Sequence, residues 1–155
     1  MQTKTVLAAI AALSLSTSAL ADAGHSHDNK PYGVPGDPKK SARVVQVAMK
    51  EQADKMLFVP NRIEVRKGEQ VRFVMKNHGA SDHEFVLGTQ DEIAAHAEQM
   101  KKNPDMEHDD PNSKRLTANQ NGDIVWRFTN AGRFEFACLI PGHMESGMVG
   151  TIIVK

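Results

Sequence analysis

The only cysteine of this chain most constrains what it can fold into, because a histidine and a methionine follow it at fixed intervals. Four residues separate Cys138 from His143, and four more separate His143 from Met148. Pro141-Gly142 predicts a turn within this loop. Thiolate, imidazole and thioether groups suit copper, and a second imidazole would complete a His₂Cys site with a weak axial methionine. The loop therefore predicts a copper site that takes one further histidine from elsewhere.

A β-strand is predicted directly before this loop. Phe134, Phe136 and Cys138 alternate toward the core, and the residues between them face outward. Met148 is expected to open the final strand, so that one short loop brings three ligands round a single point. Taken singly, each ligand has a simpler role: a free cysteine is often a small buried hydrophobe, and methionine commonly fills gaps in a core.

His83 is the preferred fourth ligand. It precedes the apolar run Phe85-Val86-Leu87, which anchors it at the start of a strand. The alternative is His78, which follows Asn77 in a segment that reads as a turn. The sequence favours His83 and leaves His78 open.

The stretch 58–73, with Lys67-Gly68-Glu69 at its turn, and the loop from Cys138 to His143 resemble the cupredoxin family, which includes plastocyanin, azurin, auracyanin and rusticyanin. The resemblance covers about residues 43–155. The loop and the long insertion before it look closest to the small periplasmic cupredoxins associated with bacterial copper tolerance. This resemblance implies a Greek-key β-sandwich with one type 1 copper site.

The implied copper ligands are His83, Cys138, His143 and Met148. Two departures from the family are visible. The spacing between cysteine and histidine is longer than in plastocyanin, and Glu84 stands where an asparagine often follows the first histidine ligand. Glu84 therefore puts the hydrogen bonding around the cysteine sulfur in question.

Short strands separated by turn residues indicate one all-β domain, a sandwich, over residues 43–155. A domain of about 110 residues is large enough for a single core. The predicted strands are Val44–Met49, Met56–Val59, Ile63–Arg66, Val71–Lys76, Glu84–Leu87, Ile124–Thr129, Arg133–Cys138 and Met148–Val154.

A helical insertion is predicted around residues 89–115. Thr89 and Glu92 fit a capping box, and Asn103-Pro104 stops the helix. The helix would place His96 and Met100 four residues apart on one face. With Met106 and His108, these residues raise the hypothesis of a second, weaker copper site. The competing interpretation is that Met100 packs the helix onto the sandwich and the histidines are solvated.

The first residues predict export. Lys4 precedes an apolar run from Val6 to Leu15, and Ala19-Leu20-Ala21 fits a cleavage site, so residues 1–21 read as a signal peptide and the expected location is the periplasm. The run is too short to remain as a membrane span. Residues 22–42 are expected to form a flexible tail whose His25 and His27 could bind copper weakly.

The charge balance and the predicted ligand set exclude some classes of function. The chain has 19 basic and 19 acidic residues, which argues against nucleic acid as a partner. A site with four protein ligands leaves no open position for a substrate, so no enzymatic activity is expected. Two hypotheses remain, with the copper ion and an unknown redox or copper-handling protein as partners. The preferred one is a copper-tolerance protein, because of the additional His and Met residues, and the alternative is a soluble electron carrier.

Overall fold

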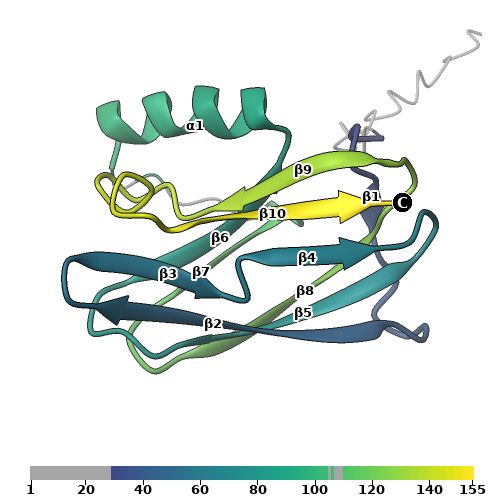
Figure 1. Ribbon diagram of the computed structural model, residues 1–155, viewed down its shortest axis with the longest axis horizontal. Coiled ribbons are helices and arrows are strands. Elements are labelled where there is room, and N and C mark those ends of the chain that lie inside the picture. Colours follow the sequence, from purple (N-terminus) through teal and green to yellow (C-terminus); the bar gives the residue numbers. More distant parts are fainter. Residues whose placement is uncertain (1–28, 105, 107–109) are drawn as a thin grey trace, which may run out of the picture.

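Two five-stranded sheets packed face to face make up the described part of the protein (Figure 1). The computed structural model describes residues 29–104, 106 and 110–155. The first sheet has the order β1-β8-β5-β2-β3, with strands at Val34–Pro35, Asn121–Arg127, Gln70–Asn77, Arg43–Gln52 and Lys55–Val59. The second sheet has the order β4-β10-β9-β6-β7, with strands at Arg62–Val65, Val149–Val154, Gly132–Ala137, His83–Gly88 and Ser113–Leu116.

The chain crosses repeatedly between the two sheets. Strands β2 and β5 are parallel neighbours in the first sheet, and β4 and β10 are parallel neighbours in the second. The predicted all-β sandwich with a helical insertion is confirmed. The eight predicted strands correspond to β2 to β6 and β8 to β10, with ends that differ by a few residues.

Aromatic side chains fill the space between the sheets. The Phe85 ring on β6 stacks on Phe136 of β9, with the ring centroids 4.9 Å apart. Phe58 of β3 meets Phe136 edge-on at 5.1 Å, and Phe73 of β5 lies 5.3 Å from Phe85. All four rings are buried. Burial of this apolar area is the main stabilising contribution to the sandwich.

The helix α1, Gln90–Lys102, lies across the outer face of the second sheet (Figure 1). The predicted capping box is present, since the Glu92 backbone N–H donates to Thr89 Oγ1 at 3.2 Å and the Thr89 N–H donates to the Glu92 carboxylate at 3.0 Å. Ile93, Ala97 and Met100 face β6 and β9. Because the helix covers that face, all six residues of β6 are buried. No helix in the described ranges is both long and apolar enough to cross a membrane.

The last part of the predicted helical insertion is a strand. Residues 113–116 form β7, which pairs antiparallel with β6 so that Leu116 lies opposite His83. The sequence Ser-Lys-Arg-Leu has too few apolar residues to show alternation, and only its pairing with a buried neighbour makes it a strand.

The segment before residue 43 also differs from the flexible tail that was expected there. Tyr32 is 1% exposed, and its ring stacks on Trp126 at 5.3 Å between centroids. Trp126 Nε1 donates to the Tyr32 carbonyl at 3.2 Å, and β1 pairs with β8. The tyrosine and the tryptophan bury apolar area against each other, which holds residues 30–37 on the sandwich. Residues 22–28, including His25 and His27, lie outside the described residues.

Candidate metal centre

His83 is the first residue of β6 and is fully buried. The turn before it is held by Asn77, whose Nδ2 donates to the Ser81 carbonyl at 2.8 Å and whose Oδ1 accepts the Gly79 N–H at 2.8 Å. This turn leaves His78 exposed. The structure therefore brings His83, and not His78, to the other predicted ligands.

The loop from Cys138 to Met148 connects β9 to β10 and is closed at its base. The Cys138 N–H donates to the Met148 carbonyl, and the Met148 N–H donates to the His143 carbonyl, each at 3.0 Å. Gly142 and Gly147 have φ values of +88° and +103°, a region that glycine adopts without steric cost. These turns fold the loop back on itself, so His143 returns toward Cys138.

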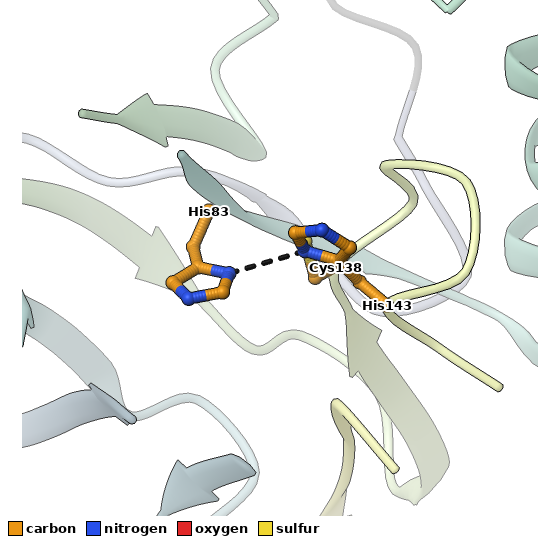
Figure 2. Close-up of side chains that lie close together, drawn as sticks. All are labelled: His83, Cys138 and His143. Carbon is orange, nitrogen blue, oxygen red and sulfur yellow. Dashed lines mark hydrogen bonds between the residues drawn. The ribbon is translucent and has the colours of Figure 1, made fainter. Parts of the chain in front are cut away.

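Three of the four predicted ligands converge on one point (Figure 2). The ligand atoms of His83, Cys138 and His143 all lie within 4.8 Å of one another. His83 Nδ1 is 3.1 Å from His143 Nδ1, and Cys138 Sγ is 3.3 Å from the same nitrogen. Two imidazoles and a thiol at this separation fit the trigonal His₂Cys set of a type 1 copper site.

Met148 lies at the base of the same loop. It is fully buried and belongs to the core cluster that also contains Cys138. Its backbone is hydrogen-bonded to both Cys138 and His143. This placement accommodates the predicted axial role, and coordination by the Met148 sulfur stays a prediction.

Glu84, the departure from the family pattern, borders the cysteine sulfur with both its backbone and its side chain. Its backbone N–H donates to Cys138 Sγ at 3.4 Å, and its Oε1 accepts the Leu139 N–H at 2.9 Å. The hydrogen bond to sulfur comes from the main chain, so a side chain other than asparagine does not remove it. The carboxylate instead ties β6 to the start of the ligand loop.

Burial sets the protonation states at the site. Removal from water raises the pKa of the Cys138 thiol to about 12, and the Glu84 N–H opposes this only in part. Burial lowers the pKa of His83, against the attraction of Glu51, and it also lowers the pKa of His143, with help from the charge of His83. At neutral pH the site therefore presents two neutral imidazoles and a thiol. A metal must displace the thiol proton to bind there.

Sequence reasoning missed Glu51 as a contact of this site. This residue of β2 lies 32 positions before His83 in the chain, yet its Oε1 is 3.2 Å from His83 Nε2. No motif or periodicity links the two positions. Only the packing of the first sheet against the second brings them together.

Those residues considered for a second copper that the structure describes are not gathered into a comparable site. Met100 is fully buried against Ile93 and Ala97, as the packing interpretation expected. Met106 packs partly buried on the same apolar cluster. His96 is half-buried on α1. In the part of the chain that the structure describes, only His83, Cys138 and His143 form a group of His, Cys, Asp or Glu able to hold a metal. His108 lies outside that part.

Comparison with known proteins decides the family. The model for copper-binding proteins of the plastocyanin/azurin family matches residues 45–155. The chain belongs to this family. It is therefore a cupredoxin and binds copper, and its His₂Cys cluster lies where the donor chemistry fits that metal.

Relatives of this cupredoxin match almost its whole length. A copper-resistant cuproprotein of Rubrivivax gelatinosus, CopI, is 51% identical over 96% of this chain and 94% of its own. A CopI of Pseudomonas aeruginosa is 33% identical over 96% of this chain and 95% of its own. Among solved structures, auracyanin B is 27% identical with a TM-score of 0.64, covering 82% of this chain and 99% of its own.

Proposed function

We propose that this cupredoxin is a periplasmic copper-tolerance protein with one redox-active type 1 copper, held by His83, Cys138, His143 and Met148. The convergence of two imidazoles and one thiol on a single point carries the proposal. Copper bound there supplies one-electron chemistry between Cu(I) and Cu(II). The protein supplies two neutral imidazoles, a buried sulfur that binds as the thiolate and a closed coordination sphere, which favour metal binding and electron transfer over catalysis.

Two observations support copper tolerance as the role. Relatives that are similar along almost the whole chain are described as copper-resistant cuproproteins. The signal-peptide pattern of residues 1–21 supports export, where a single unlinked cysteine is best explained as a metal ligand. Any copper uptake beyond one equivalent would depend on histidines outside the cluster, so it should be lost when His25, His27, His96 and His108 are replaced.

Growth of a deletion strain tests this function. Loss of the gene should sensitise cells to added copper, and the wild-type gene should restore growth. Cys138→Ser should not restore it, because it removes the thiolate. His78→Ala is the matched control, since this exposed histidine lies outside the cluster, and it should restore growth fully. Normal copper tolerance in the deletion strain would reject the function.

A soluble electron carrier is the second candidate. His143 is half-buried on a loop beside the exposed Pro141 and the half-buried Ile140 and Met144, an arrangement that would let a redox partner approach the ligand. A carrier predicts impaired respiratory or photosynthetic electron flow in the deletion strain at ordinary copper levels. A copper-tolerance protein predicts a defect only when copper is added.

A further inference from the structure

We propose that Glu51 is a positioning residue of the copper site: its carboxylate accepts the Nε2–H of His83, holds Nδ1 toward the metal and strengthens this imidazole as a ligand for Cu(II). The proposal rests on His83 being a copper ligand, as proposed above. Its first consequence, the choice of tautomer, can be measured in the copper-free protein.

The contact joins the two sheets at the end of the sandwich that carries the site. Glu51 is near the end of β2 in the first sheet, and His83 begins β6 in the second. Glu51 Oε1 lies 3.2 Å from Nε2, while Nδ1 of the same ring faces His143 at 3.1 Å. Figure 2 shows the second ring nitrogen of His83 on the side turned away from Cys138 and His143. The two ring nitrogens thus have separate partners.

The surrounding backbone is shaped to hold this carboxylate. Glu51 Oε1 also accepts the Ser81 N–H at 2.9 Å. A Cβ on Gly79 would lie 2.5 Å from Glu51 Oε1 and 2.8 Å from His83 Nε2, closer than such atoms can approach. A side chain at position 79 would therefore push directly against this contact. The Glu51 side chain is 28% exposed and the His83 side chain 0% exposed, so the hydrogen bond is largely shielded from water.

The chemical effect follows from the tautomer. A neutral imidazole carries one N–H, and an acceptor at Nε2 places it there, which leaves the Nδ1 lone pair for the metal. A carboxylate acceptor also increases the basicity of the ligating nitrogen and fixes the ring orientation. A negative charge near the metal favours Cu(II) over Cu(I). Removal of such partners typically costs 10- to 100-fold in metal affinity.

Nitrogen-15 NMR of the copper-free protein tests the positioning step. We expect His83 to be a pure Nε2–H tautomer in the wild type, and a mixture in Glu51→Ala. Gly79→Ala places a methyl group against both the carboxylate and His83 Nε2, and it should also give a mixture because it breaks the contact between them. A pure Nε2–H tautomer in both variants, each checked by circular dichroism to be folded, would overturn the proposal.

Copper binding tests the effect on the metal. Glu51→Gln keeps an oxygen acceptor and removes the charge, so it should weaken Cu(II) binding at least tenfold while changing Cu(I) binding less. A tenfold change in the Cu(II)/Cu(I) affinity ratio corresponds to a potential about 59 mV higher. Asp82→Asn is the matched control, because Asp82 precedes His83 but pairs with Arg115 at 3.3 Å.

The outcomes separate the two proposals. A rise in the reduction potential of Glu51→Gln that clearly exceeds the rise in Asp82→Asn supports the role of Glu51. Equal shifts would show a general charge effect and overturn it, as would no shift in Glu51→Gln. If the wild-type protein binds copper without a thiolate-to-copper absorption band, the ligand set of the proposed function fails, while the tautomer measurement still decides whether Glu51 orients His83.

Discussion

The two histidines of the metal centre are held in opposite ways. His83 is fully buried on a strand, fixed by sheet pairing, by the Asn77 turn and by Glu51. His143 is half-buried on a loop that connects two strands. Its own turns and its closed base hold this loop, together with the Met56 N–H, which donates to the Ser146 carbonyl at 3.1 Å. The strand therefore holds His83 in a fixed position. The loop carries His143, the ligand that solvent and partner proteins can reach. Four measurements test this difference between the two histidines.

Loss of the Cys138 thiolate should have the largest effect on the copper site. Its sulfur contacts both the Glu84 N–H on β6 and the His143 ring on the loop. Cys138→Ser should abolish the intense visible thiolate-to-copper charge-transfer band of the Cu(II) protein. Absorption spectroscopy of the copper-loaded variant measures this. Retention of a strong band would remove Cys138 from the ligand set.

Cavity variants of the two histidines should behave differently. His143→Gly opens a site on an exposed loop, so added imidazole should enter and restore most of the charge-transfer band. His83→Gly removes a buried ring whose place external imidazole cannot easily reach, so the band should stay weak. Titration with imidazole, followed by absorption, compares the two. Equal restoration would contradict the difference between the two histidines.

Copper affinity should rise with pH because the buried thiol is protonated. The folded-state pKa of Cys138 is raised to about 12, while burial lowers the pKa of both histidines. Between about pH 7 and 9, binding should release one thiol proton, so Cu(II) affinity should increase about tenfold per pH unit. The increase should be steeper in acid, where the imidazoles are also protonated. Competition with a chelator of known pH dependence measures the slope.

Replacement of the cysteine gives the control for this slope. Cys138→Ser has no thiol proton to displace, and its Cu(II) affinity should be nearly independent of pH over the same range. Equal slopes in the two proteins would assign the released proton to another group.

Replacement of Met148, the predicted axial ligand, should have the smallest of the four effects. Met148→Gln replaces a soft thioether by a harder oxygen donor, which favours Cu(II) and should lower the reduction potential by about 59 mV for each tenfold change in affinity ratio. Met100→Leu is the control, since this buried methionine lies in the separate cluster under α1. Its potential should not change. Voltammetry that finds Met148→Gln unaltered would leave Met148 as a packing residue.

The parts of the site that the sequence predicts are those that depend on residues near one another in the chain. Cys138 and His143 lie on one loop, so their spacing alone places them together. His83 could be chosen over His78 because an apolar run follows it, and the capping box located the start of α1. Coordination by Met148 remains a prediction.

What the sequence did not reveal depends on contacts between distant segments. Glu51 contacts His83 only because the two sheets pack together, and no local sequence pattern indicates this contact. Tyr32 stacks on Trp126 from a segment rich in glycine and proline, whose composition is typical of a tail. Strand β7 exists only through its pairing with β6. Composition and periodicity describe neighbours in the chain, and these features involve neighbours in space.

The pairing of β1 with β8 has a practical consequence for handling the protein. Val34 lies opposite Arg127, and Val154 lies opposite Gly132, so β1 and Lys155 sit at the end of the sandwich away from the Cys138–Met148 loop (Figure 1). A linker attached at Lys155 would thus immobilise the molecule on an electrode or a bead with the half-buried His143 facing the solution. Such an orientation suits direct voltammetry and the capture of proteins that dock at the loop.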